Sequence, residues 1–220
     1  MDTALVVALD GPSGSGKSST ARGVADRLSL AFLDTGAMYR AMTWALLQRG
    51  IDVDDPEAVA EAAEGIHIVS GTNPRAPGIE AEGVDVAGPI RSEEITAAVS
   101  AVAAVPRVRA LMVEQQRAII AASRGIVVEG RDIGSVVAPH ARVKIFLIAD
   151  SGARASRRAA ENEGADKGVT QKALAQRDHK DSTRAASPLT RAEGAIVIDT
   201  TFLTLDDVID KVVSLVAEAR

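Results

Sequence analysis

Short apolar runs recur along the chain, and segments with helical spacing separate them. The runs occupy residues 4–9, about 31–33, 126–128, 143–148 and 195–198. Continuous apolar runs of this length are typical of strands that are buried on both faces of a parallel sheet. After the first run, apolar residues recur at i, i+3, i+4 and i+7, the spacing of one helix face: Ala21, Val24, Ala25 and Leu28. The alternation predicts an α/β fold in which a five-stranded parallel sheet carries helices on both faces.

Sequence signals mark where several of the helices begin. Pro56 follows Asp55, which predicts a short helix with proline in its first turn. Pro106 opens a second helix, which we expect to run to about Ser123. Thr204 and Asp207 have the spacing of a capping box, which predicts the start of the last helix.

Residues 65–91 follow a different pattern. Short alternating runs, at 66–70 and 79–86, are broken by glycine and proline. This pattern favours a small antiparallel sheet, which we interpret as an insertion in the parallel core. His67 lies in the first of these runs, and no second histidine or cysteine stands near it in the sequence. We therefore expect it on the surface of a strand rather than in a metal site.

The composition narrows the possible functions. Aromatic residues make up 2% of the 220 residues and the net charge is −5, whereas nucleic-acid-binding surfaces are basic and stack bases on aromatic rings. The chain has no cysteine, which excludes disulfides and thiolate metal sites. It shows neither a secretory signal pattern nor an apolar stretch approaching the length of about 18 residues that spans a membrane. We expect a soluble cytoplasmic protein with one domain over 1–220 and with neither nucleic acid nor a membrane as partner.

The most specific chemical signal is the phosphate-binding P-loop pattern, G-x-x-x-x-G-K-S, at residues 11–18. It lies between the first predicted strand and a predicted helix, which is where such a loop works. Its glycines let backbone N–H groups curve around an oxyanion, and the start of the helix adds partial positive charge. Lys17 can reach the β- and γ-phosphates of a nucleotide, and Ser18 can ligate Mg²⁺.

Polar residues also follow the next two predicted strands of the sheet. Thr35 and Arg40 come after the second strand, and Glu129, Arg131 and Asp132 come after the third. Because the carboxyl ends of parallel strands meet at one edge, these side chains are expected beside the P-loop. Arg40 is suited to a second phosphate, and Glu129 occupies the place of an acid that holds Mg²⁺. A solvated helix position for Arg40 and a surface ion pair after the third strand are the alternatives.

Arginines concentrate in the last third of an otherwise acidic chain. One predicted helix carries three of them on one face, and a second carries alternating arginine and aspartate: Arg154, Arg157 and Arg158, then Arg177, Asp178, Asp181 and Arg184. A P-loop enzyme needs cations over the transferring phosphoryl group, which favours a lid. Residues 163–168 have glycines near both ends, which suits a mobile segment of that lid. A solvated charged face is the alternative interpretation.

Taken together, these blocks resemble the bacterial cytidylate kinase family, within the nucleoside monophosphate kinases. The resemblance covers about residues 4–218 and rests on blocks at 10–18, 34–40, 105–109, 130–134, 144–147 and 177–189. The D-T-G-A-M-Y-R, P-R-V-R and G-R-D-I-G blocks are the specific ones. The resemblance implies a P-loop kinase fold with its core at 1–40, 104–150 and 190–220. It also implies a monophosphate-binding insert with a small sheet at about 41–103 and a helical lid at about 151–189.

The resemblance implies roles for individual residues. ATP phosphates would lie against the loop formed by Gly11, Pro12, Ser13, Gly14, Ser15, Gly16, Lys17, Ser18 and Ser19. The CMP phosphate would bind Arg40 and Arg131, the cytosine ring Ser100, Arg109 and Asp132, and the ribose Arg177 and Asp181. Arg154, Arg157, Arg158 and Arg184 would close over the transferring phosphate. The family often has serine where Thr35 lines the pocket, and either residue offers a hydroxyl.

The implied reaction transfers a phosphoryl group from ATP to CMP or dCMP, with Mg²⁺. The acceptor oxygen is already ionised at neutral pH, so no general base is needed. Asp132 would accept from the N4 amino group of cytosine, whereas uracil presents a carbonyl there. A shikimate- or adenylate-kinase-like acceptor is the nearest alternative, and a GTP switch is disfavoured because the chain has no N-K-x-D block. No long heptad stripe occurs, so we expect a monomer.

Overall fold

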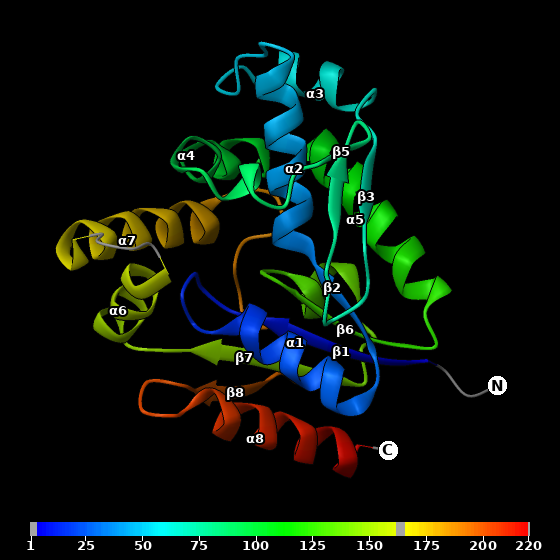
Figure 1. The fold of residues 1–220 in the computed structure, drawn as a ribbon, viewed down its shortest axis with the longest axis vertical. Helices are drawn as coiled ribbons and strands as arrows, with labels where there is room; N and C mark the ends of the chain where they lie inside the picture. The colour runs from blue at the N-terminus through cyan, green and yellow to red at the C-terminus, as the bar shows by residue number, and fades with distance from the viewer. Residues whose placement is uncertain (1–3, 162–165, 220) are drawn as a thin grey trace.

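The centre of the molecule is a five-stranded parallel sheet (Figure 1). The computed structural model describes residues 4–161 and 166–219. The strands lie in the order β2-β6-β1-β7-β8, and every neighbouring pair is parallel. Their bounds are β1 Leu5–Asp10, β2 Ala31–Asp34, β6 Gly125–Gly130, β7 Val143–Ile148 and β8 Ile196–Asp199. The predicted fold class and all five predicted strands are confirmed.

Alternating side chains send the strands' apolar residues into two cores, one on each face of the sheet. Val7 and Leu9 of β1 enter one core, whereas Ala8 enters the other. The first core also holds buried residues of α1 (Lys17–Leu28) and α8 (Leu205–Glu218). The second holds buried residues of α2 (Thr35–Gln48) and α5 (Pro106–Ala122). Figure 1 shows α1 and α8 on one side of the strands and α2 and α5 on the other.

The pattern at 65–91 predicted a small antiparallel sheet, and the structure has one there, packed against α2. Its strands are β3 (Ile68–Ser70), β4 (Ile79–Ala81) and β5 (Val84–Asp85), paired in that order. Buried residues of β3 and β4 join the same core as α2, which fixes this sheet to the rest of the molecule. His67 is exposed and immediately precedes β3.

Two further helix starts agree with the caps that the sequence predicted. Asp55 accepts from the N–H groups of Glu57 and Ala58 at the start of α3 (Pro56–Ala63), and Thr204 and Asp207 form the capping box of α8. The others are η1 (Pro89–Arg91), α4 (Glu93–Val102), η2 (Ile133–Val137), α6 (Ser151–Glu161) and α7 (Lys167–Thr183). The predicted mobile segment covers residues 163–168, of which 163–165 lie outside the described residues.

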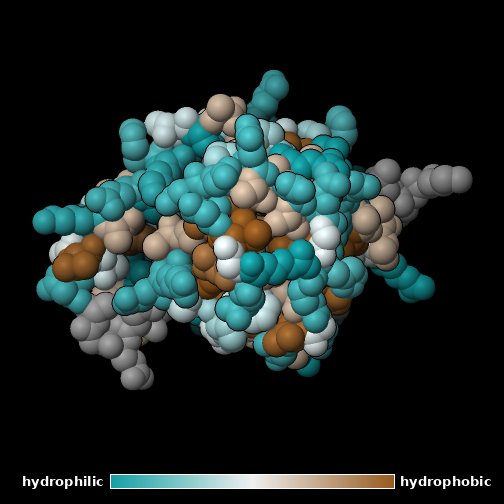
Figure 2. Space-filling view, turned by 90° about the horizontal axis from the view of Figure 1, so that it is seen from above, coloured by the Kyte–Doolittle hydropathy of each residue, from teal (hydrophilic) through white to brown (hydrophobic). Residues whose placement is uncertain are grey.

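In the part of the chain that the structure describes, no single helix is long and apolar enough to cross a membrane. Helices α4 and α5 reach that length and composition only together, with a bend of 98° between them. Their buried apolar residues belong to the core shared with α2. Figure 2 shows the face seen from above, where hydrophilic side chains cover most of the surface and hydrophobic ones form small patches.

Candidate active site

Three strand ends meet at one edge of the sheet and carry the chemistry-bearing residues. The register pairs Asp10 of β1 with Gly130 of β6, and Asp34 of β2 with Glu129 of β6. The connections that leave the neighbouring strands β1 and β6 run in opposite directions along the sheet. From β1 the chain passes through α1 to β2, and from β6 it passes through η2 to β7. Such a switch point, at the carboxyl ends of the strands, is where open α/β sheets bind ligands.

The P-loop joins β1 to α1 in a conformation that depends on its glycines. Gly11, Gly14 and Gly16 have φ values of 147°, 75° and 88°. A Cβ on Gly11 would lie 2.2 Å from the carbonyl oxygen of Leu147, so the loop passes β7 too closely for any side chain there. The N-cap residue of α1 is Gly16, so no side chain caps the start of this helix, and its first turn carries no acidic residue. The partial positive charge at the start of α1 is therefore available to a phosphate.

Lys17, at the end of this loop, and Glu129, near the end of β6, are buried groups of opposite charge, and each affects the pKa of the other. The side chain of Lys17 donates from Nζ to the carbonyl oxygen of Pro12 over 2.7 Å. Burial, together with the charge of Arg131, lowers the pKa of Lys17. Burial also raises the pKa of Glu129 to about 8, and the charge of Asp34 adds to that rise. Burial thus disfavours the charged forms of both side chains. A bound polyanion would favour the charged form of Lys17, and a bound cation would favour that of Glu129.

The pair Glu129 and Ser18 fits a magnesium ion. The Oε1 atom of Glu129 is buried without a hydrogen-bond partner, and the Ser18 hydroxyl lies close enough to lower the pKa of this carboxyl. Among residues 4–161 and 166–219, no three histidine, cysteine or acidic side chains gather as a metal site. Mg²⁺ in phosphotransferases is usually held by one or two protein oxygens and by the substrate phosphates, so two such oxygens suffice.

One cavity of about 170 Å³ lies at this edge, and it is lined at one end by the P-loop and at the other by α2, α4 and α5. It brings together most of the residues predicted from the sequence. They are Ser13, Gly14, Gly16, Lys17, Ser18, Ser19, Thr35, Arg40, Ser100, Arg109, Glu129, Arg131, Asp132, Arg158, Arg177, Asp181 and Arg184.

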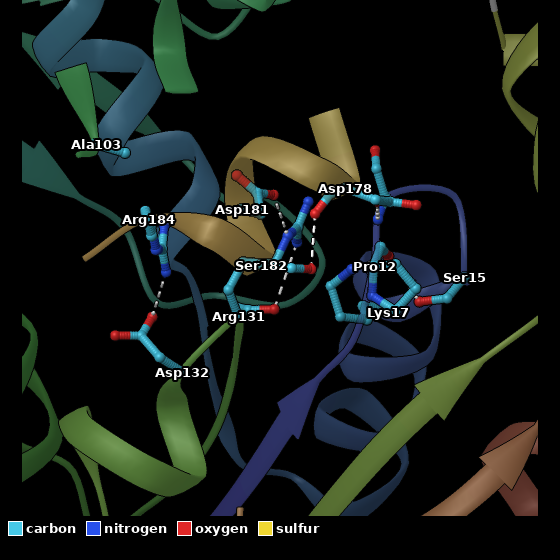
Figure 3. Close-up of polar contacts among 12 residues, drawn as sticks. Pro12, Ser15, Lys17, Ala103, Arg131, Asp132, Asp178, Asp181, Ser182 and Arg184 are labelled. Atoms are coloured by element: carbon cyan, nitrogen blue, oxygen red, sulfur yellow. Dashed lines mark hydrogen bonds and ion pairs between the residues drawn. The ribbon is translucent and has the colours of Figure 1, made fainter. Parts of the chain in front are cut away.

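The middle of the cavity is crowded with guanidinium groups. Burial lowers the pKa of Arg40 to about 10, and repulsion from Arg158 adds to it. Burial likewise lowers the pKa of Arg177 to about 9, with further contributions from Arg131 and Arg40. Arg131 donates from Nε to Oδ2 of Asp181 over 2.9 Å, as Figure 3 shows. The surplus of positive charge around this cavity suits the binding of an anion.

The far end of the cavity holds a buried polar group of a different kind. Asp132 forms an ion pair with Arg109, and its Oδ1 atom lies 3.6 Å from Nη2 of Arg184 (Figure 3). The guanidinium of Arg109 lies over the ring of Tyr39 at 5.5 Å from its centroid. Nε of Arg109 and Nη2 of Arg184 are buried without hydrogen-bond partners. One carboxylate acceptor and two arginine donors therefore line the cavity here, a set that suits the edge of a nucleobase.

Residues 7–218 of the chain match the sequence model of the protein family described as Cytidylate kinase. The chain belongs to the cytidylate kinase family. The cytidylate kinase of Streptomyces coelicolor is 58% identical to it over 218 residues, which are 99% of this chain and 94% of that protein. The cytidylate kinase of Streptomyces avermitilis is 54% identical, with the same coverage of 99% and 94%.

The solved structures that the chain resembles confirm its fold. A gluconokinase from Sinorhizobium meliloti matches with a TM-score of 0.50 and 13% identity over 99% of this chain and 94% of that one. At this identity the likeness concerns the fold alone, that of the small P-loop kinases. The family resemblance predicted from the D-T-G-A-M-Y-R, P-R-V-R and G-R-D-I-G blocks is confirmed over almost the whole chain.

In this member of the cytidylate kinase family, two of the four arginines predicted for the lid do not line the cavity. Arg154 donates to the carbonyl oxygen of Ser13 over 3.1 Å and pairs with Asp178. Arg157 donates to Thr200, at 3.0 Å to its hydroxyl and 2.5 Å to its carbonyl oxygen. Arg154 thus contacts the P-loop directly, at Ser13. Arg157 contacts it through Thr200, whose hydroxyl donates to the carbonyl oxygen of Ser15.

The sequence interpretation gave no role to Asp34, Tyr39, Asp178 or Thr200. Asp34 and Tyr39 line the cavity, and Asp178 accepts from the N–H group of Ser13 over 3.4 Å. Asp34 and Thr200 each end or follow a strand of the sheet, at β2 and β8. The rule that singled out Glu129 would therefore have found both, whereas nothing in the sequence marks Asp178 over its helical neighbours.

Proposed function

We propose that the protein transfers the γ-phosphoryl group of ATP to CMP and dCMP, which yields ADP and CDP or dCDP. One observation carries the proposal: a single cavity has a phosphate-binding loop at one end and a buried base-sized set of polar groups at the other. Membership of the cytidylate kinase family supports it. The two ends are joined by guanidinium groups, which is where two phosphates would meet.

At the donor end, backbone N–H groups of residues 11–19 and the Lys17 ammonium would hold the ATP phosphates. Ser18 and Glu129 would hold Mg²⁺, which supplies positive charge to the phosphoryl group when bound. The depressed pKa of Lys17 returns toward its ordinary range once phosphate charge lies beside it. Lys17 is then fully cationic where charge builds up in the transition state.

At the acceptor end, Arg40 and Arg131 would bind the phosphate of CMP, and Arg177 and Asp181 would bind the ribose. The nucleophile is a phosphate oxygen that is ionised at neutral pH, so the protein need not remove a proton. Catalysis then consists of in-line placement and of neutralising charge on the equatorial oxygens. Arg131 is suited to both tasks, since Asp181 accepts from its Nε while Nη1 makes a long hydrogen bond, 3.4 Å, to the carbonyl oxygen of Gly130.

The base would be selected by the buried group around Asp132. A carboxylate accepts from the N4 amino group of cytosine, and Arg109, Arg184 and Ser100 offer donors to the carbonyl edge. Uracil would place a carbonyl against the same carboxylate and leave both oxygens without a donor. Unpaired buried polar groups cost about 1–3 kcal/mol each, enough for discrimination by orders of magnitude.

Helices α6 and α7 would serve as a lid that excludes water from the phosphoryl group. In this proposal Arg154, Arg157, Arg158 and Arg184 move toward the phosphates when CMP binds. The chain would act as a cytoplasmic monomer and as one P-loop kinase domain, with the core, insert and lid at the boundaries predicted from the sequence.

The decisive experiment is a coupled ADP-release assay with ATP and Mg²⁺ and a panel of acceptors: CMP, dCMP, UMP, AMP and shikimate. We expect CMP and dCMP to give the highest kcat/KM. Lys17→Ala is the control, because it removes the donor-side cation and should abolish turnover with every acceptor. Preference for AMP or shikimate would overturn the proposal while leaving the P-loop kinase fold untouched.

A further inference from the structure

Asp10, the last residue of β1, makes a contact that the phosphate-binding role of its loop does not need. Its side chain is buried, with the residue 3% exposed. Oδ1 accepts from the N–H group of Ile133 and Oδ2 from that of Gly134, both over 2.8 Å. The carboxylate thus contacts the first turn of η2, which follows the neighbouring strand β6.

These two N–H groups belong to the helix that Asp132 precedes. Asp132 is the N-cap residue of η2, and it makes no cap hydrogen bond with its side chain. Aspartate at this position ordinarily accepts from the N–H group two or three residues later, here that of Gly134 or Ser135. Asp10 already accepts from Gly134, and the Asp132 carboxylate faces Arg109 and Arg184 rather than its own helix, as Figure 3 shows for Arg184.

We infer that Asp10 is a positioning residue for base selection: by capping η2 from another strand, it keeps the Asp132 carboxylate turned to the cavity. The inference rests on the proposed function, since it concerns the group that would read cytosine. Asp10 itself does not line the cavity and would touch neither nucleotide.

The surroundings of Asp10 make the contact rigid. A Cβ on Gly134 would lie 3.1 Å from Ala192 and 3.4 Å from Oδ2 of Asp10, so the backbone of η2 is packed directly against the carboxylate. Burial raises the pKa of Asp10 to about 6, and the charge of Asp132 contributes to that rise. At pH 7.5 the carboxylate is ionised, and both of its oxygens act as acceptors.

Loss of Asp10 leaves two buried N–H groups without a partner, a costly state. As the N-cap residue of η2, Asp132 is placed to accept from the N–H group of Gly134, so its carboxylate would turn from Arg109 toward its own helix. Removal of Asp10 should therefore reproduce at a distance what removal of Asp132 does directly. It should impair the choice of base while the P-loop keeps its affinity for ATP.

The test measures kcat/KM with CMP and with UMP, and KM for ATP, at pH 7.5 for the wild type, Asp10→Asn and Asp10→Ala. Asparagine keeps the size and one acceptor, so its effect should be the smaller of the two. We expect the ratio of kcat/KM for CMP over UMP to fall by roughly tenfold or more in Asp10→Ala. KM for ATP should stay within about twofold, since ATP phosphates use other atoms of the loop.

A double-mutant cycle separates this role from a structural one. If Asp10 acts through Asp132, Asp10→Asn should lower the CMP-over-UMP ratio in the wild type and leave it unchanged in an Asp132→Ala background. Equal losses with CMP and UMP, or losses that add to those of Asp132→Ala, would overturn the inference. Failure of both Asp10 variants to fold would overturn it too, because Asp10 would then belong to the fold. A wild type without CMP preference would refute the proposed function instead, so the two failures are distinguishable.

Discussion

Arg131 and Asp181 connect the sheet edge to helix α7 through one hydrogen-bonded ion pair, with Nε and Oδ2 2.9 Å apart. Arg131 follows β6, and Asp181 lies in the last turns of α7, fifty positions later. Both side chains are largely shielded from water, at 18% and 7% exposure. The pair therefore fixes the proposed acceptor cations relative to the lid helix, and it is sensitive to loss of either partner.

We expect Asp181→Ala to raise KM for CMP by roughly tenfold, because a buried arginine loses the carboxylate that orients it. Asp178→Ala is the matched control on the same helix. Asp178 contacts the P-loop through Ser13 and Arg154, so its loss should raise KM for ATP and spare KM for CMP. Steady-state kinetics with each substrate varied in turn would check both. The same pattern of losses in the two variants would contradict separate donor and acceptor ends.

Asp132→Ala should lower the selectivity for CMP over UMP by roughly 10- to 100-fold, more than it lowers affinity for ATP. The alanine removes the acceptor for the cytosine amino group and also the charge that repels the uracil carbonyl. Competition between CMP and UMP in one reaction vessel measures this ratio directly. Proportional losses with CMP and UMP would exclude Asp132 from base recognition.

Lys17→Met should reduce kcat by about 100-fold or more without lowering the free energy of unfolding. The ammonium is needed beside phosphate charge, but burial lowers its pKa, so the folded protein holds this charge unfavourably. The carbonyl oxygen of Pro12 keeps its second donor, the Ser15 hydroxyl, at 3.0 Å. Urea unfolding in parallel with the kinetic assay gives both quantities. A strong loss of stability would mean that Lys17 supports the fold of the loop.

Glu129→Gln should stabilise the ligand-free protein increasingly as the pH rises. Burial raises the pKa of Glu129 to about 8, so between about pH 5 and pH 8 the folded state holds a proton that the unfolded chain releases. Wild-type stability then falls with pH by up to about 1.4 kcal/mol per unit from this group, and glutamine removes that slope. Urea unfolding at pH 5, 6, 7 and 8, without nucleotide or Mg²⁺, measures the difference. Parallel curves for the two proteins would show that Glu129 ionises normally.

The sequence predicted the central sheet well because its strands are continuous apolar runs, of which β6, an inner strand of the sheet, is buried on both faces. The position of polar residues directly after those runs brought Thr35, Arg40 and Glu129 to the cavity, since parallel strands end at one edge. This rule needs only strand direction, which the alternation with helices supplies.

The directions of individual side chains could not be predicted in the same way. Arg154 and Arg158 share a helix face by their i, i+4 spacing, yet Arg158 lines the cavity and Arg154 pairs with Asp178. The contact of Asp10 with η2 joins residues 123 and 124 positions apart, and no local pattern encodes it. Such contacts depend on how whole elements pack, which residue spacing along one element does not contain.

The most direct test of one cavity for two nucleotides is a crystal structure with CMP, Mg²⁺ and an ATP analogue that does not transfer its phosphoryl group. We expect the analogue's phosphates against residues 11–19, the CMP phosphate between Arg40 and Arg131, and the cytosine ring beside Asp132. CMP bound elsewhere, or arginines 40 and 131 turned to solvent with both ligands present, would contradict the account.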